Sequence, residues 1–130
     1  MKQIQYKDKH FLVVSNVGHG VNDLYWFIFP LLLPQILETF GLSYSKAGAI
    51  LTGYLTVIAV SSFIIGKISD RYSKWLLLAP GFLAAFIGLL ASGFTQTLPF
   101  FIIAIAIAAI GVSTFHPCMY ALIDERTIQK

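Results

Sequence analysis

Four long apolar runs, separated by short polar connections, divide the chain. They cover residues 11–37, 45–68, 75–94 and 98–122 in round terms. Each is close to the ~20 residues that an α-helix needs to cross a hydrocarbon core about 30 Å thick. In lipid every backbone N–H and C=O must be hydrogen-bonded within the protein, and a helix achieves this within one segment. The pattern therefore predicts an all-α, polytopic membrane protein with four transmembrane helices.

The connections between the runs carry residues that end or begin helices. The first, "ETFGLSYS", places Gly41 after a helix, and the third, "TQTLP", places Pro99 in the first turn of the next helix. Gly adopts the left-handed conformation that ends many helices, and Pro is tolerated in a first turn because its missing N–H is not needed there. Both signals support the predicted helix boundaries.

The composition places these helices in a lipid bilayer. Hydrophobic residues make up 57% of the chain and charged residues 12%, and the mean hydropathy is +0.77. A soluble domain carries about a quarter charged residues. The net charge is only +3 and the basic residues are scattered, so nucleic acid is not predicted as a partner. A single cysteine, Cys118, excludes an internal disulfide.

Lys and Arg are distributed unevenly between the two sides of the predicted membrane region. Eight of the nine lie in the terminal tails or in the connection 67–74, and only Lys46 lies on the other side. Since cytoplasmic segments carry an excess of Lys and Arg, both termini and this connection are predicted to be cytoplasmic, in a multi-pass protein of the cell membrane. Asp124 and Glu125 mark the cytoplasmic end of the fourth helix, where one of them is expected to pair with Arg71 or Lys74.

Small residues recur at helical spacing on the second and third predicted helices. Stripes of this kind let two membrane helices approach closely without lipid between them, so a close neighbour is predicted for each. The stripes contain Ser45, Gly48, Ala49, Thr52, Gly53, Thr56, Ala59, Ser62 and Gly66 on the second helix, and Gly81, Ala84, Ala85, Gly88, Ala91 and Ser92 on the third.

The connection "GKISDRYSK" places Gly66, Asp70, Arg71 and Lys74 in the pattern GxxxDRxxK. Gly66 lets the end of the helix approach a neighbour, and Asp70 is suited to accept hydrogen bonds at a helix N-terminus. Arg71 and Lys74 hold the loop in water. The alternative interpretation is an ordinary solvated turn whose charges only set the topology.

This connection resembles the cytoplasmic loop signature of the major facilitator superfamily. "GHGVNDLY" (18–25) and "GVSTFHP" (111–117) are similar to segments of the fosmidomycin-resistance-type transporters in that superfamily. The resemblance covers nearly the whole chain and implies a proton-coupled secondary carrier, commonly an exporter of small molecules. The superfamily often has an Arg in the fourth helix one turn before its Gly. Here Ile107 stands ahead of Gly111, so a coupling role for that Arg is not carried over.

The resemblance also implies an architecture. Superfamily members have two six-helix halves, each built from three-helix inverted repeats. The predicted helices make one such repeat plus one helix, so the chain is expected to form part of the N-terminal half. It is therefore expected to be an N-terminal fragment, with the missing C-terminal portion of the transporter as a partner.

Polar residues gather on one face of the first predicted helix. His19, Asn22, Asp23 and Trp26 follow one another at i, i+3, i+4 and i+7. Asp23 comes twelve residues after Phe11, or ~18 Å along a helix that rises about 1.5 Å per residue. An ionisable group at this depth is costly and needs a partner or a water-filled cavity. Asp23, His19 and Asn22 are therefore candidates for proton coupling or for lining a substrate cavity.

The fourth predicted helix offers a matching face. Ser113 and His116 lie on it, and Pro117 leaves a nearby backbone carbonyl without its helical donor. His19 and His116 lie ~12 Å and ~9 Å from the cytoplasmic ends of their helices, so the two imidazoles are predicted to face one cavity. The alternative is that both are hydrogen-bonded packing residues.

These features predict a secondary active transporter that moves a small solute by alternating access, with protons as the coupling ion. The sequence shows no Walker loop, no cluster of metal ligands and no nucleophile placed with a base, so no enzyme, cofactor or metal site is predicted. A complete four-helix homodimeric transporter of the small multidrug type is the first alternative. Such proteins centre on a Glu in the first helix and have a weak charge bias, unlike this chain. The second alternative is a membrane scaffold that does not transport.

Reporter fusions test the predicted topology. Fusions after Leu42, Tyr72 and Thr97 should report outside, inside and outside, because Lys and Arg hold the connection 67–74 in the cytoplasm. Paired alkaline phosphatase and fluorescent-protein fusions at each position measure the side. A cytoplasmic signal at Leu42 would contradict the topology and, with it, the shared cavity.

Overall fold

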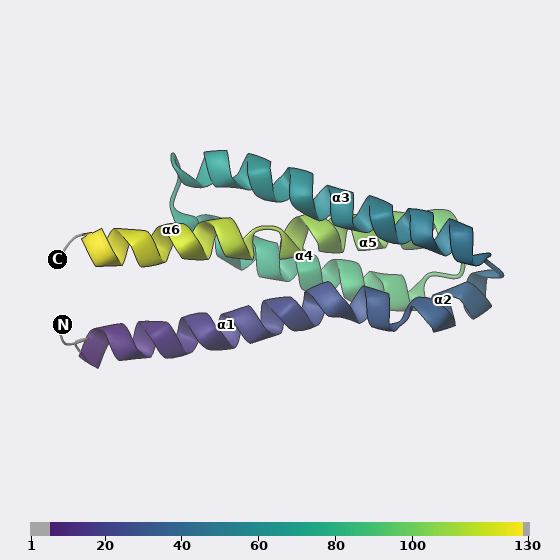
Figure 1. Cartoon of the computed structure of the whole chain (residues 1–130), viewed down its shortest axis with the longest axis horizontal. Coiled ribbons are helices and arrows are strands. Elements are labelled where there is room, and N and C mark those ends of the chain that lie inside the picture. The colour runs from purple at the N-terminus through teal and green to yellow at the C-terminus, as the bar shows by residue number, and fades with distance from the viewer. Residues whose placement is uncertain (1–5, 129–130) are drawn as a thin grey trace.

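All regular structure in the described part of the chain is helical. The computed structural model describes the backbone of residues 6–128 and the side chains of residues 9–125. The helices run along a common long axis, and α1 begins at the end of the bundle where α6 ends (Figure 1). The predicted all-α class is confirmed. The helices are α1 (Tyr6–Leu31), α2 (Leu33–Phe40), α3 (Tyr44–Ser69), α4 (Lys74–Phe94), α5 (Leu98–Val112) and α6 (Phe115–Ile128).

Hydropathy supports a membrane crossing for part of this bundle. α1 is long enough to cross a membrane, with 26 residues, but polar side chains between residues 15 and 23 lower its mean hydropathy below that of a typical membrane-spanning helix. Hydropathy therefore supports three of the four predicted crossings among the described residues. The segments long and apolar enough to cross are Tyr44–Ser69, Lys74–Phe94 and Leu98–Glu125, the last formed by α5 and α6.

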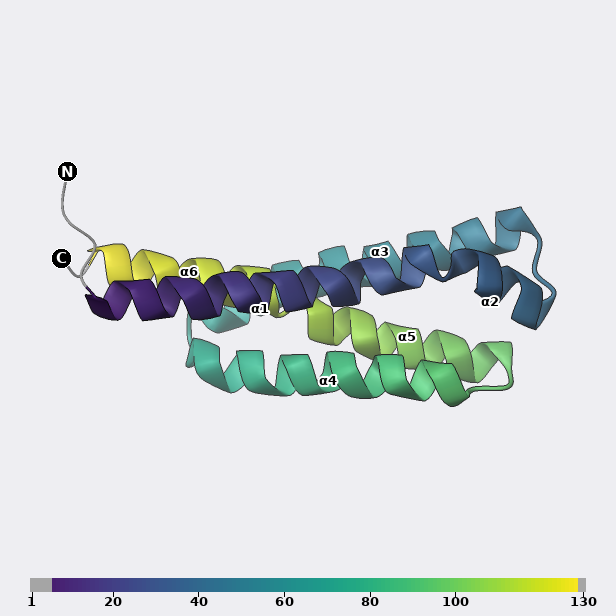
Figure 2. The same cartoon turned by 90° about the horizontal axis from the view of Figure 1, so that it is seen from below.

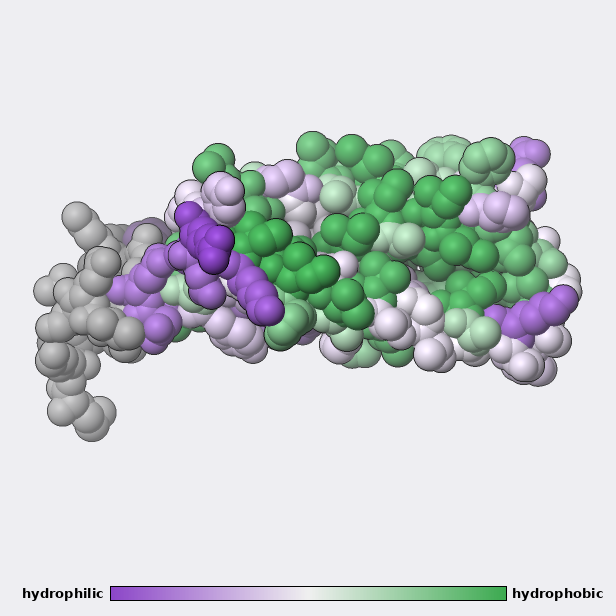
Figure 3. All heavy atoms as spheres, turned by 90° about the horizontal axis from the view of Figure 1, so that it is seen from above, coloured by the Kyte–Doolittle hydropathy of each residue, from purple (hydrophilic) through white to green (hydrophobic). Residues whose placement is uncertain are grey.

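The surface of the bundle suits a lipid environment. Apolar residues cover its middle, and hydrophilic residues gather toward its ends (Figure 3). Large side chains such as Phe63 and Ile103 are 65% and 56% exposed. An apolar surface of this extent is unusual on a soluble monomer and normal where lipid or another apolar surface covers it.

The first predicted helix, residues 11–37, is divided into α1 and α2. The division lies at Leu32, shortly before Pro34. Pro34 has no N–H to donate to the carbonyl of Pro30, and its ring crowds that carbonyl. α2 ends at Gly41, whose φ of 59° is the left-handed conformation that Gly adopts without strain. The Gly in the "ETFGLSYS" connection thus ends the helix as the sequence predicts.

Small residues bring α4 and α5 into close contact. Gly81, Ala85 and Gly88 of α4 are buried. A Cβ added at Gly88 would lie 2.7 Å from the carbonyl oxygen of Ala104 and nearer still to the backbone N of Ala108. Two backbones approach this closely only where the facing side chains are very small. The neighbour predicted for the third helix is therefore present, and α4 and α5 lie side by side (Figure 2).

The small residues in the first half of α3 do not make such a contact. A Cβ added at Gly48 or Gly53 would meet no neighbouring helix within 4 Å. Thr52 and Thr56 are exposed, and their hydroxyls donate to carbonyls of their own helix. The predicted neighbour is therefore missing at Gly48 and Gly53, where α3 turns buried Tyr54 toward the bundle. It is present at the other end of the stripe, where Ser62 and Gly66 meet Ser113 and Pro117.

Two clusters of buried apolar side chains hold the helices together. Phe115 belongs to the second cluster and directly precedes His116, so its burial fixes the beginning of α6 against the bundle. The first cluster contains Phe29, Ile36, Tyr54, Phe101, Ile105 and Ala109. The second contains Ile65, Leu78, Phe115, Cys118, Met119 and Leu122.

Enlarging Gly88 should force α4 away from α5. In Gly88→Ala the new methyl overlaps the backbone of α5, so we expect the free energy of unfolding to fall by roughly 1–3 kcal/mol, the usual cost of overpacking. Gly93→Ala lies in the same helix with no atom within 4 Å of the added carbon and is the matched control. It should change stability by less than about 0.5 kcal/mol. Unfolding by SDS in mixed micelles, followed by circular dichroism, compares the two. Equal stabilities would refute the close contact.

Candidate functional site

The fourth predicted helix, residues 98–122, is interrupted between α5 and α6. Pro117 explains the interruption, because it has no N–H to donate to the carbonyl of Ser113 and its ring crowds that carbonyl. The freed carbonyl nevertheless has a donor. Ser62 Oγ, on α3, donates a hydrogen bond of 3.2 Å to it. A bond between helices thus replaces the helical bond that Pro117 removes.

Two further hydroxyls complete the hydrogen bonding at this break. Ser113 Oγ donates to the carbonyl of Ile110 at 2.6 Å, and Thr114 Oγ1 donates to the carbonyl of Gly111 at 2.8 Å. Ser113 is 1% exposed. Its side chain therefore supports the backbone at the break. The sequence predicts that Ser113 faces a cavity, whereas in the structure it is buried.

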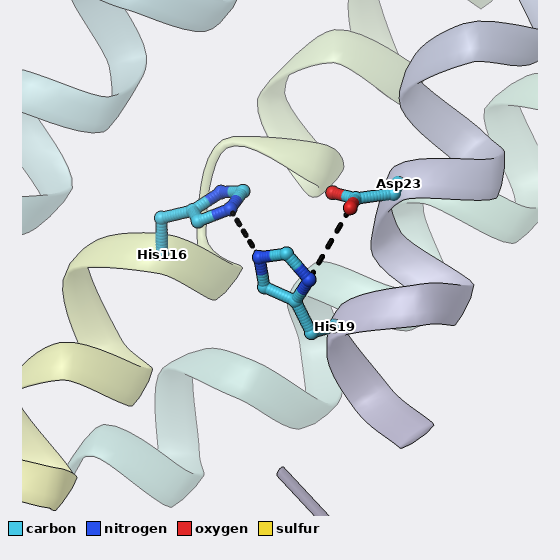
Figure 4. Close-up of side chains that lie close together, drawn as sticks. All are labelled: His19, Asp23 and His116. Carbon is cyan, nitrogen blue, oxygen red and sulfur yellow. Dashed lines mark hydrogen bonds and ion pairs between the residues drawn. The ribbon is translucent and has the colours of Figure 1, made fainter. Parts of the chain in front are cut away.

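His19, Asp23 and His116 form a polar cluster that joins α1 to α6 (Figure 4). The Nδ1 atom of His19 lies 3.2 Å from Asp23 Oδ2, one turn along α1. The Nε2 atom of His19 lies 3.3 Å from Nε2 of His116 on α6. The sequence predicts that the two imidazoles face one cavity, and the structure brings them into direct contact.

For an ionised Asp23 and a neutral His19, the contacts of the polar cluster assign one hydrogen to each imidazole. An ionised Asp23 can only accept, so His19 donates its Nδ1–H to the carboxylate. A neutral His19 then has its lone pair on Nε2, and His116 donates Nε2–H across the 3.3 Å contact. This tautomer assignment follows from the network of donors and acceptors. The carboxylate at one end of the chain of bonds therefore orients both imidazoles.

The polar cluster is walled on one side and open on the other. The side chains of His19 and Asp23 are 47% and 37% exposed. Buried Phe115 packs edge-on against His19, with ring centroids 5.9 Å apart. A proton, a cation or a polar solute can therefore reach the cluster from its open side. Although the sequence predicts no cluster of metal ligands, one ligand atom from each of the three residues lies within 4.8 Å of the others.

Asn22 and Trp26 lie outside the polar cluster, although the sequence places them on the same face of the helix. Asn22 is 2% exposed, and its Nδ2 atom has no hydrogen-bond partner among the described residues. The same is true of Nε1 of Trp26. The structure thus turns these two donors into the bundle, while His19 and Asp23 remain on its open side.

A family model places the chain among known proteins. The model described as Major Facilitator Superfamily matches residues 16–127, most of the chain. The chain belongs to the major facilitator superfamily. The superfamily predicted from the loop signature is thereby confirmed.

Two curated proteins share part of this sequence. The chain is 25% identical over 95 residues to the uncharacterized MFS-type transporter YwfA of Bacillus subtilis (strain 168), a match covering 73% of this chain and 23% of YwfA. It is 33% identical over 63 residues to Protein spinster homolog 3 of Mus musculus, covering 48% of this chain and 12% of that protein. The chain thus spans less than a quarter of the length of either relative. No solved structure matches it significantly.

The superfamily loop signature begins beside the break between α5 and α6. A Cβ added at Gly66 would lie 3.8 Å from Cβ of Pro117. Ser62, one turn earlier on α3, donates to Ser113 at the same break. A shallow groove of about 400 Å³ runs between α3 and α6 and reaches Ala121 of α6. The loop and the polar cluster are therefore joined through one set of contacts around Pro117.

The charged residues of the superfamily signature lie at the end of the bundle. Asp70 is the exposed C-cap of α3, and Ser73 is the N-cap of α4. The expectation that Asp70 lies at a helix N-terminus is therefore wrong for the described helices. Arg71 is exposed, whereas Lys74 forms the ion pair with Glu125 that the sequence predicts.

The sequence singled out Ser62 only as a small packing residue and did not reveal its role as a hydrogen-bond donor. Pro117 predicts a carbonyl without its donor at Ser113, and that carbonyl needs a hydroxyl from another helix. Several Ser and Thr residues of α3 qualify by chemistry alone. Only the packing of α3 against α6 selects Ser62.

Proposed function

We propose that this superfamily member acts as a secondary active transporter, which moves a small solute across the cell membrane by alternating access and is driven by a proton gradient. Membership of the superfamily supports a role in transport across membranes. The observation that carries the finer proposal is the polar cluster, in which a carboxylate and two imidazoles connect two helices. Ionisable groups inside a membrane are costly, and they commonly mark pathways for protons, ions or substrates.

The proposal requires α1 to cross the membrane beside α5 and α6. Its 26 residues span about 39 Å, which exceeds the ~30 Å hydrocarbon core. α1 also runs lengthwise along helices whose hydropathy supports a crossing (Figures 1 and 2). Part of its low hydropathy comes from His19 and Asp23, which bond within the polar cluster, and from Asn22, which is buried in the bundle. The position of α1 thus supports the fourth crossing.

Asp23 is the proton-carrying group in this proposal, and His19 links it to His116. When Asp23 binds a proton, its carboxyl gains a donor and loses part of its capacity to accept. The hydrogen bond from His19 Nδ1–H to Asp23 is then weaker, and the His19 tautomer that accepts from His116 is no longer favoured. Protonation on α1 therefore alters the contact between α1 and α6.

The solute pathway lies on the open side of His19 and Asp23. Alternating access around a site needs helices on both sides of it. We therefore propose that further membrane helices cover this side in the working carrier, with both termini of these 130 residues in the cytoplasm. The resemblance of residues 18–25 and 111–117 to fosmidomycin-resistance-type transporters favours export of a drug or metabolite.

The loop signature, in this proposal, sets the balance between conformations without touching the solute. Gly66 lies against Pro117, and the Lys74–Glu125 ion pair links the beginning of α4 to α6. Asp70 and Arg71 remain exposed at the end of the bundle. They are therefore placed to contact another part of the carrier in one of its conformations.

Replacing Asp23 with Asn tests the coupling. The amide keeps the shape and an oxygen acceptor for His19 but cannot carry a proton, so gradient-driven accumulation should fall by about tenfold or more while solute exchange continues. The assay uses proteoliposomes holding a carrier polypeptide that contains these residues, with and without an imposed pH gradient. Radiolabelled fosmidomycin is a probe solute because of the family resemblance. Co²⁺ is the second probe, because ligand atoms of three residues lie close together in the polar cluster.

Glu38→Gln is the matched control, since it removes an exposed carboxylate near the end of α2. It should leave accumulation unchanged. Undiminished gradient-driven uptake by Asp23→Asn would reduce Asp23 to a structural hydrogen-bond acceptor. Gradient-driven transport by the 130-residue chain on its own would instead favour the homodimeric four-helix transporter.

Replacing Asp70 with Asn tests the role of the loop. If Asp70 stabilises one conformation, the transport rate should fall several-fold while the equilibrium dissociation constant of the solute changes little. Asp124→Asn, an exposed acid at the cytoplasmic end of α6, is the control. Rate and binding are measured on the same proteoliposome preparations. A large loss of binding at an unchanged rate of conformational exchange would contradict this role.

A further inference from the structure

The two imidazoles of the polar cluster have the spacing of metal ligands. Zn²⁺–nitrogen bonds of ~2.05 Å to two atoms 3.3 Å apart enclose an angle of about 107°, close to the tetrahedral value. The two atoms are Nε2 of His19 and Nε2 of His116, which point toward one another from α1 and α6 (Figure 4). On binding, His116 carries its hydrogen on Nδ1 in place of Nε2, which frees the Nε2 lone pair, and little side-chain movement is then needed to place a cation between the two atoms.

Asp23 supplies the surroundings that a metal-binding imidazole uses. A histidine that binds a metal usually donates its other ring N–H to a carboxylate or carbonyl, which fixes the tautomer and strengthens the ligand. His19 Nδ1 lies 3.2 Å from Asp23 Oδ2, so Nε2 carries the lone pair and faces His116. The negative charge of Asp23 also offsets part of the charge of a cation held one ring away.

We propose that His19 and His116 bind a divalent transition-metal cation through their Nε2 atoms, with Asp23 as the positioning residue for His19. Imidazole nitrogen suits Zn²⁺, Co²⁺ and Ni²⁺, whereas Mg²⁺ and Ca²⁺ prefer oxygen ligands. The remaining coordination positions face the open side of the cluster. The cation is cargo of the carrier, either bare or within a small complex, and this assignment rests on the transport function proposed above.

The exposure of the cluster suits a transported ion. A structural metal is enclosed by protein ligands, whereas a site that exchanges its occupant keeps open positions. His19 is 47% exposed at its side chain, and the described residues offer few ligands beyond the two imidazoles and Asp23. The cation can therefore enter and leave from the side on which the solute pathway lies.

Cobalt binding to the purified 130-residue chain in lipid nanodiscs tests the site. Tetrahedral Co²⁺ has intense visible absorption that reports its geometry. We expect saturable binding of one Co²⁺ per chain, displaced by Zn²⁺ and not by Mg²⁺. His19→Gln and His116→Gln should each weaken binding, and Asp23→Asn should weaken it by about 10–100-fold, the usual effect of losing an outer-shell partner.

His10→Gln is the matched control, because His10 lies on α1 outside the cluster. It should bind Co²⁺ as the native chain does, and circular dichroism checks the helical content of every variant. His116→Cys offers a second ligand at the same place. It should retain Co²⁺ and add a thiolate-to-cobalt charge-transfer band, which the native chain should lack because Cys118 is fully buried.

The outcomes separate the metal site from the transport function. Absence of Co²⁺ binding by helical native chain, or native-like binding by both Gln variants, would overturn the metal site and leave the proposed transporter intact. Site-specific binding without gradient-driven Co²⁺ movement, bare or complexed, would overturn its assignment as cargo. Failure of every probe solute to accumulate would count against the transport function, whatever the binding result.

Discussion

Backbone N–H and C=O groups find no water in the core of a bilayer, so each must be hydrogen-bonded to protein. Helices meet this constraint everywhere except at proline. At Pro117 the carbonyl of Ser113 would lose its donor, and Ser62 of α3 supplies one. The hydroxyls of Ser113 and Thr114 satisfy neighbouring carbonyls within the same turn. The chain therefore changes from α5 to α6 inside the membrane region without leaving these carbonyls unpaired.

The position of the polar cluster depends on this break. His116 comes directly before Pro117 in α6, so the break sets the direction in which its ring points. The buried ring of Phe115 holds the beginning of α6, and His19 meets His116 from α1. Gly66, the first residue of the loop signature, approaches Pro117 on its other side. A movement of α6 about the break would therefore change the contacts of both the polar cluster and the loop, so the two are physically linked.

Periodicity and hydropathy located the long helical segments, because the bilayer imposes one solution on long apolar runs, but they did not predict the breaks at Leu32 and between α5 and α6. The pairing of His19 with His116 was also predictable, since their depths match on helices expected to line a cavity. Other features depend on packing. The small residues of α3 look like those of α4 in sequence, yet no neighbouring helix approaches Gly48 or Gly53, whereas Gly88 of α4 meets the backbone of α5. Asn22 shares a predicted face with Asp23 but is buried, because a rotation of α1 of less than one turn decides which polar residues open outward.

The contact between the two imidazoles can be measured directly. In the chain reconstituted in lipid with ¹⁵N-labelled histidine, solid-state ¹⁵N–¹⁵N correlation at short mixing time detects only nitrogens that are close together. The 3.3 Å separation predicts a cross-peak between Nε2 of His19 and Nε2 of His116, which persists in His10→Gln and disappears in His116→Gln. Resolved signals from both rings without that cross-peak would contradict the contact on which the polar cluster rests.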